Sequence, residues 1–357
     1  MREDRWDEAD TLIRRKFKAV PFGDQVLFAA SRRDTASLRQ LRTQAAEKAG
    51  QKGRRSADLA IEAGWLLAIY LEDLDRAEEF ARFGTAASLS PGLQASAHQL
   101  LASLAVAGGR WSAAKTEFLA AGVAHPDSAL IGRALTAALP FLMVPKPDLE
   151  QIRGEVERWE PGSDVSMPLP ESLRPLIRQV RLYLLGLLSA RLGEGTGALR
   201  YAGELEKLTA PPDSRALMRD LGRTVRAEVA ASAGRAEEAL SLLEGVKGEV
   251  PFELIRLPYF SGEHPRYLRS MLLHQVGRDE EGLRLLEVGF VGTPNELHYR
   301  APVHLLRAAI SQRLGRRPAA ADQYSRFLRL WKACDPALGP LVEGARAELA
   351  SLTAEPR

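Results

Sequence analysis

The chain has 357 residues, of which 45% are hydrophobic and 6% aromatic, and it carries 49 basic and 46 acidic side chains. The net charge of +3 is too small to indicate a nucleic-acid-binding protein as a whole, and it is local, since residues 1–60 hold 14 basic and nine acidic residues. The single cysteine, Cys334, excludes an internal disulfide and predicts a reducing compartment.

Residues 1–56 are predicted to form a basic N-terminal segment of two or three short helices. Breaks are expected at residues 21–23 and 50–53, where proline and glycine interrupt the helical pattern. The most basic run consists of Arg14, Arg15, Lys16 and Lys18. A solvated helix end is the simpler interpretation of this run, and contact with nucleic-acid phosphates is the alternative.

Residues 57–91 are predicted to form a first helical hairpin, because apolar residues recur three and four positions apart. Trp65 and Ala77 are expected where its two helices meet. Glu72 takes the turn position, which a glycine holds in the later hairpins.

A glycine with similar neighbours recurs along the rest of the chain, in part at spacings of roughly 38–43 residues. These glycines are Gly109, Gly193, Gly234, Gly277 and Gly315. A small residue lies seven positions before each of them: Ala102, Gly186, Ala227, Ser270 and Ala308. Another follows five positions after each: Ala114, Ala198, Ala239, Gly282 and Ala320. We expect each glycine to end a helix in the left-handed conformation, and the small residues to let two helix axes approach to about 8–9 Å.

The remaining boundaries follow from this register. Residues 57–159 are predicted to be hairpins, with an irregular last one at residues 127–159, where the spacing of the glycines doubles. The proline-rich segment 160–172 is predicted to be a linker. Residues 173–352 are predicted to be regular hairpins, closed by a capping helix at about 338–352 with a polar outer face.

The register resembles the tetratricopeptide repeat family over about residues 58–335. The resemblance implies an all-α fold, a right-handed α-solenoid of about six to seven helical hairpins with a C-terminal capping helix. The segments Ala301-Pro302-Val303-His304 and Arg329-Leu330-Trp331-Lys332, followed by Asp335-Pro336, are similar to the closing part of bacterial arrays of this family. Such arrays often follow Ser/Thr kinase or transcription-regulator domains, which implies a signalling context.

No catalytic, cofactor or metal motif is predicted. The six histidines lack the one-turn spacing of a helical metal site, and Gly193-x-Gly195-x-Gly197 follows a predicted helix rather than a strand. No predicted apolar stretch is long enough to span a membrane, and the charged segment Met1–Arg5 is not typical of a secretory signal, so we expect a cytoplasmic protein.

The concave face of the solenoid is the candidate partner-binding surface, because the first helix of each hairpin lines it in arrays of this kind. The residues expected there are Tyr183, Arg191, Thr224, Glu228, His264, Tyr267, Met271, His274, Gln275, Gln312 and Arg313. Aromatic, methionine and arginine side chains are typical of peptide and helix recognition, although the same residues could pack against neighbouring hairpins.

The sequence therefore predicts a non-catalytic scaffold that binds a peptide or helical segment of another protein, in a bacterial signalling or multiprotein complex. The alternative is a nucleic-acid-linked transcriptional or signalling regulator that uses the basic N-terminal segment. The partner and the oligomeric state are not predicted.

Overall fold

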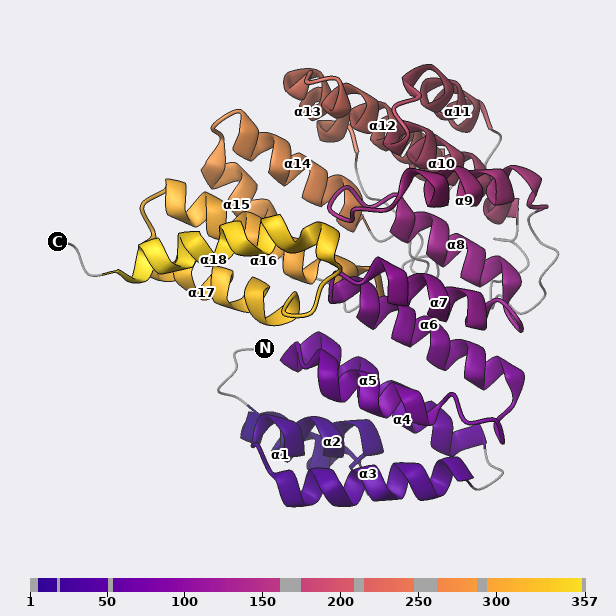
Figure 1. Ribbon diagram of the computed structural model, residues 1–357, viewed down its shortest axis with the longest axis vertical. Helices are drawn as coiled ribbons and strands as arrows, with labels where there is room; N and C mark the ends of the chain where they lie inside the picture. The colour runs from indigo at the N-terminus through magenta and orange to yellow at the C-terminus, as the bar shows by residue number, and fades with distance from the viewer. Residues whose placement is uncertain are drawn as a thin grey trace. The chain divides into compact units, whose positions relative to one another are not determined.

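The computed structural model describes residues 6–17, 20–50, 54–160, 175–208, 215–246, 262–287 and 294–354. Every regular element in these ranges is a helix, as Figure 1 shows, so the all-α fold class expected from the sequence is confirmed. The chain divides into two compact units, one of Met1–Ala105 with Ala113–His125 and the other of Val106–Ser112 with Pro126–Arg357. The predicted linker, apart from Glu160, lies outside the described residues and stays a prediction.

The first unit contains short helices that pack in consecutive pairs. They are α1 (Trp6–Lys16), α2 (Phe22–Ser31), α3 (Thr35–Gly50), α4 (Arg54–Leu71), α5 (Leu74–Phe83) and most of α6 (Pro91–Ala107) and α7 (Trp111–Ala121). Helix α2 packs against α3 and α4, and α4 packs along α5. The rings of Phe22 and Phe80 meet edge to face at 6.4 Å, so α2 and α5 share one apolar core.

The second unit, taken by itself, is also built of paired helices. Its helices are α8 (Pro126–Ala137), α9 (Lys146–Arg158), α10 (Pro175–Arg191), α11 (Gly195–Lys207), α12 (Arg215–Ser232), α13 (Ala236–Glu244), α14 (Glu263–Gln275), α15 (Asp279–Glu287), α16 (Pro294–Arg313), α17 (Arg317–Leu330) and α18 (Gly339–Thr353). Each even-numbered helix from α8 to α16 pairs with the helix after it, and α10, α12, α14 and α16 pack side by side (Figure 1). First helices therefore form one face of the unit.

The turns between paired helices use the left-handed backbone expected of glycine. Gly193 has φ 79°, its N–H bonds to the Ala190 carbonyl at 3.0 Å, and the N–H of Glu194 bonds to the Ser189 carbonyl at 2.9 Å. This pair of bonds is a Schellman cap, which satisfies carbonyls at the end of the first helix. The other predicted turn glycines also have positive φ: Gly109, Gly234, Gly277 and Gly315.

A turn of the same kind joins α2 to α3 without a glycine. Arg33 has φ 55°, and the N–H of Asp34 bonds to the Ala29 carbonyl at 2.9 Å, as in the later turns. The sequence predicts helices here but not this hairpin, because its turn cue is glycine and an arginine holds the position.

The α4–α5 turn corrects one predicted position. Glu72 lies at the turn with φ 54°, as expected, but Gly64 rather than Trp65 lies at the contact between the helices. A Cβ atom on Gly64 would lie 2.8 Å from the Ala77 carbonyl oxygen. The reason is that the closing bond, from the Asp73 N–H to the Leu67 carbonyl, spans six residues rather than five, which moves the register by one.

Small residues meet at the helix contacts of the second unit. Ala227, Ala239 and Ala320 are fully buried. A Cβ atom on Gly282 would lie 3.2 Å from the Ser270 carbonyl oxygen, and one on Gly186 would lie 2.9 Å from a Val225 methyl group. The paired helices α14 and α15, and the neighbouring first helices α10 and α12, are therefore too close for larger side chains at these positions.

Residues 106–112 and 331–335 of the second unit are joined by hydrogen bonds. The Trp331 indole donates to the Ala107 carbonyl at 3.0 Å, and the Asp335 N–H donates to the Gly109 carbonyl at 3.0 Å. The Asp335 carboxylate accepts from the Ser112 N–H at 3.0 Å and from its hydroxyl at 2.7 Å, and so caps the start of α7.

Helix α18 covers the outer side of α17, as predicted for a capping helix. Val342 and Ala345 are buried, whereas Glu343, Arg346 and Glu348 on the other side are exposed. The apolar end of the array is thereby shielded from water.

We expect Ala320→Leu to lower the free energy of unfolding by about 1–3 kcal/mol, because the added atoms have no room at the α16–α17 contact. Ala319→Leu is the matched control, since Ala319 is exposed in the same helix turn and should change stability little. Urea unfolding followed by circular dichroism measures both variants. Equal stability of Ala320→Leu and wild type would contradict the proposed helix contact.

Replacement by alanine of two glycines that have open space around them should change folding stability in opposite directions. Gly315 has φ 74°, so Gly315→Ala should destabilise by about 1 kcal/mol through backbone strain alone. Gly344 lies inside α18, and no atom lies within 4 Å of the position that a Cβ atom would take, so Gly344→Ala should stabilise by about 0.5–1 kcal/mol. Thermal unfolding of the two variants side by side tests the assignment, which fails if both shift in the same direction.

Candidate partner-binding site

The predicted partner-binding residues lie on α10, α12, α14 and α16, the first helices that pack side by side. We call the surface that these helices share the first-helix face. Side chains from successive helices meet there, since His264 of α14 lies beside Glu228 of α12 and Tyr299 of α16. The face is therefore one continuous surface rather than a series of separate positions.

A chain of polar contacts crosses three of these helices. His264 on α14 lies with its Nδ1 2.8 Å from the Tyr299 hydroxyl of α16. Its Nε2 lies 2.7 Å from Glu228 Oε1 of α12, in an orientation too bent for a regular hydrogen bond. Because a carboxylate only accepts, the ring proton belongs on Nε2, and the Tyr299 hydroxyl donates to Nδ1. The imidazole thus links α12 to α16.

Three aromatic rings pack beside this chain. Phe141, from the loop between α8 and α9, lies 5.6 Å from Tyr267 and 5.2 Å from Tyr299, edge to face in both cases. Tyr267 and Tyr299 lie 5.5 Å apart. Sequence reasoning found Tyr267 but missed Phe141 and Tyr299. Phe141 has no periodic signal because it lies in the loop of the irregular hairpin, and Tyr299 lies far from the turn glycine by which α16 was recognised.

The predicted residues differ in how accessible they are. Tyr183 and Thr224 are each 2% exposed and Glu228 is 7% exposed, so these three side chains are part of the interior. The Thr224 hydroxyl donates to the Asp220 carbonyl of its own helix at 2.8 Å. Tyr267 and His264 are half-buried and can contact solvent. The accessible part of the first-helix face is therefore smaller than the sequence suggested.

The tyrosines of this face stay protonated at neutral pH. Burial raises the pKa of Tyr183, and the Glu228 carboxylate raises it further. Burial likewise raises the pKa of Tyr267, and it raises that of Tyr299 well above the ordinary range. The Glu228–His264–Tyr299 chain has the order of an acid–base–nucleophile triad, but a buried hydroxyl with a raised pKa is a hydrogen-bond donor and not an activated nucleophile.

Two arginines of the predicted set form hydrogen bonds to the preceding hairpin. Arg313, two residues before its turn glycine, bonds to the Asp279 carboxylate and to the His274 carbonyl of the preceding hairpin. Arg191, at the same position in its own hairpin, donates from Nη2 to the Leu142 carbonyl at 2.9 Å. His274 Nδ1 also lies 2.6 Å from Asp279 Oδ1. Arg313 and His274 therefore stabilise the array, whatever else they contact.

The other predicted residues are spread along the edge of the face. Gln312 donates to Glu348 at 2.7 Å and accepts from the Tyr324 hydroxyl at 2.9 Å, so it joins α16 to α17 and α18. Met271 packs against an apolar cluster of the α12–α14 region. Gln275 is exposed at the end of α14.

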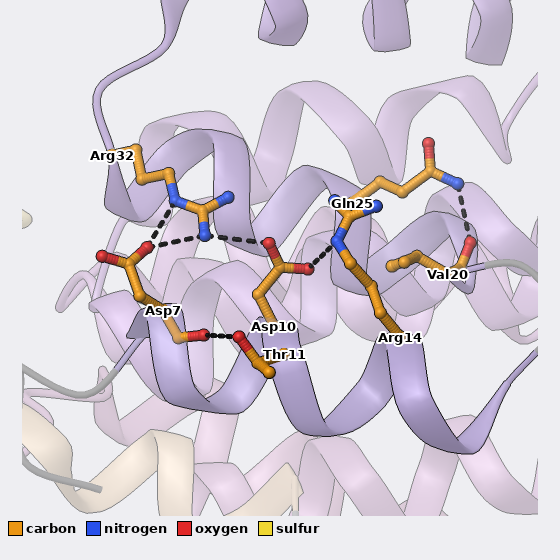
Figure 2. Close-up of polar contacts among 7 residues, drawn as sticks. All are labelled: Asp7, Asp10, Thr11, Arg14, Val20, Gln25 and Arg32. Atoms are coloured by element: carbon orange, nitrogen blue, oxygen red, sulfur yellow. Dashed lines mark hydrogen bonds and ion pairs between the residues drawn. The ribbon is translucent and has the colours of Figure 1, made fainter.

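The basic run of α1 is accompanied by carboxylates, as Figure 2 shows. Arg14 donates to Asp10 at 2.7 Å, and Arg32 of the first unit bonds to Asp7 and Asp10 at 2.7 and 2.9 Å. Burial works to raise the pKa of Asp10, but the hydrogen bonds from Arg32 and Arg14 outweigh it, and the pKa is lowered. Part of the positive charge is thus neutralised locally.

Nucleic-acid binding by the remaining basic residues stays a prediction. Arg15 and Lys16 are exposed at the end of α1, and Lys18 lies outside the described residues. In the described ranges, no three His, Cys, Asp or Glu side chains gather as a metal site would require. In the same ranges, no helix is both long and apolar enough to cross a membrane.

The repeated left-handed turns and the small residues at the helix contacts agree with the resemblance to the tetratricopeptide repeat family that the sequence predicts. No protein-family model matches the sequence. No curated protein matches it either.

Two solved structures are similar in their chain path. A tetratricopeptide repeat protein from Parabacteroides merdae has 16% sequence identity and a TM-score of 0.39, over 84% of this chain and 100% of its own. The APC/C hetero-tetramer Cut9–Hcn1 has 13% identity and a TM-score of 0.35, over 99% of this chain and 83% of the matched chain. The resemblance to the tetratricopeptide repeat family is carried by this chain's own turns and helix contacts.

Glu263, at the start of α14, predicts a pH dependence of stability. It is 3% exposed, and burial raises its pKa from 4.5 to about 7. A carboxyl group whose pKa is raised in the folded state binds a proton that the unfolded state has released. Folding stability therefore falls as pH rises from 4.5 to 7, by up to about 1.4 kcal/mol per pH unit.

We expect Glu263→Gln to gain stability relative to wild type as pH rises through this window, and to keep that gain above it. Glu281→Gln is the control, because the Arg278 hydrogen bond lowers the pKa of that carboxyl from 4.5. Its effect should therefore have the opposite sign and appear only below pH 4.5, with no change relative to wild type across the Glu263 window. Urea unfolding at several pH values measures both variants. A difference between Glu263→Gln and wild type that does not change with pH would contradict the shifted pKa.

Proposed function

We propose that this chain is a non-catalytic protein-binding module that takes a peptide or helical segment of a partner on its first-helix face. The observation that carries the proposal is the meeting of aromatic and polar side chains from four successive first helices on that one face. Aromatic groups beside hydrogen-bonding groups are typical of the centre of protein interfaces.

The half-buried residues are the contacts that we assign to the partner. Tyr267 presents an aromatic ring at the edge of the buried cluster, with Met271 one helical turn away on α14. A flexible methionine next to a rigid ring suits a surface that adapts to a segment of another protein. Gln275 adds an exposed amide at the end of the same helix.

We further propose that the module acts in the cytoplasm, in a bacterial signalling or multiprotein complex. The support is the similarity of residues 301–336 to the closing part of arrays that accompany kinase and transcription-regulator domains. The catalytic or DNA-binding partner would then act from another polypeptide or domain.

The test uses the purified protein as bait in a lysate of its own cells, with captured proteins identified by mass spectrometry. Tyr267→Ala should reduce recovery of a specific partner at least tenfold, because it removes the accessible ring of the face. Leu199→Ala is the matched control, since Leu199 is 38% exposed on the second helix α11. Recovery of every captured protein at the wild-type level by Tyr267→Ala would contradict the proposal.

A further inference from the structure

The loop between α8 and α9 places one of its own side chains on the first-helix face. Phe141 lies 5.6 Å from Tyr267 and 5.2 Å from Tyr299, measured between ring centroids. The seat formed by these two tyrosines is thus an aromatic site that is already filled by an aromatic side chain from a loop. We call it the Phe141 seat.

The loop is held in place by residues on either side of Phe141 and not by Phe141 itself. Leu139 and Leu142 are buried on either side, and the Leu142 carbonyl accepts from Arg191 Nη2 at 2.9 Å. Phe141 itself is half-buried, and Met143 next to it is 61% exposed. The ring can therefore leave the seat by rotation about its own side-chain bonds while the anchoring residues keep their places.

Arg191 supplies a second, independent indication. Its Nε atom is buried and, in the part of the chain that the structure describes, has no hydrogen-bond acceptor, although Nη2 of the same guanidinium is used. A buried donor without an acceptor is costly, and it would be satisfied by one more carbonyl arriving next to the Leu142 carbonyl. A segment that carries an aromatic side chain next to a main-chain carbonyl would replace Phe141 in the seat and would supply the acceptor that Arg191 Nε lacks.

We propose that the Phe141 seat recognises an aromatic side chain of a partner protein segment, and that Phe141 occupies the seat until the partner displaces it. The incoming ring packs on Tyr267 and Tyr299, and a carbonyl of the same segment accepts from Arg191 Nε. This inference rests on the proposed function, and it specifies the partner as an aromatic-bearing segment that competes with the chain's own loop.

The test is a titration of the full chain with the synthetic peptide acetyl-Leu-Pro-Phe-Leu-amide, which copies residues 139–142. Phe141→Ala empties the seat and should bind this peptide at least tenfold more tightly than wild type, as measured by isothermal titration calorimetry. Met143→Ala, in the same loop but exposed, is the matched control and should behave as wild type. The peptide with alanine in place of phenylalanine should not bind Phe141→Ala.

Several results would overturn the inference. One is a folded Phe141→Ala protein that does not bind the peptide, and another is equal binding by Phe141→Ala and wild type. Adding Tyr267→Ala to Phe141→Ala should weaken binding at least tenfold, and unchanged binding would place the peptide elsewhere. Self-association of Phe141→Ala in sedimentation experiments, in place of peptide binding, would make a second copy the occupant and would also contradict it.

Folding and function can be separated in this design. If Phe141→Ala does not fold, the titration is made on Phe141→Leu, which keeps apolar volume but lacks the ring, and the same tenfold criterion applies. Loss of peptide binding together with Tyr267-dependent capture of a partner would reject the Phe141 seat alone. Peptide binding without any Tyr267-dependent partner would reject the proposed function and keep the seat.

Discussion

The close approach of paired helices is the constraint on which the rest of this structure depends. At the α14–α15 contact the residues are serine and glycine, and a carbonyl of Ser270 lies only 3.2 Å from where a Cβ atom of Gly282 would be. Such an approach requires a tight turn, which a left-handed residue supplies after α2, α4, α6, α10, α12, α14 and α16. The tight turn and the small residues are therefore both needed for the two helices of a hairpin to approach closely. Hairpins that have the same turn and the same kind of contact stack in the same way. The side-by-side first helices, and hence the candidate site, follow from this stacking.

The interior that results is more polar than helix stacking alone would give. Glu228, His264 and Tyr299 connect three first helices, and Glu263 is buried close by with a raised pKa. Burying such groups is costly, and the contacts among them recover only part of the cost. Because these groups lie on three different helices, their contacts form only when the helices are in one register. The same groups also give the face the mixture of rings and hydrogen-bonding atoms from which we infer protein binding.

The fold could be predicted further than the site. The turn glycines, the small residues after them and the capping helix were all recognised in sequence, because each depends on neighbours within a few tens of residues. Two local errors have local causes, since Arg33 makes a glycine-type turn without glycine and the hydrogen bond that closes the α4–α5 turn spans one residue more than in the glycine turns. For the site, sequence reasoning identified the helices that carry it but could not tell that Tyr183 is buried or that Arg313 and His274 fasten hairpins. Those properties depend on which side chain of the adjacent hairpin lies opposite.

By itself, the sequence determined the helical hairpins, their turns and the small residues at which paired helices meet, because periodicity and backbone conformation are short-range properties. Three other features follow only from the packing of the folded chain: Phe141 enters the first-helix face, Tyr299 completes the polar chain, and Asp335 caps α7 from 223 positions away along the chain. These contacts depend on how the intervening hairpins pack on one another. No local pattern encodes that packing, since it arises from every helix contact between the two segments.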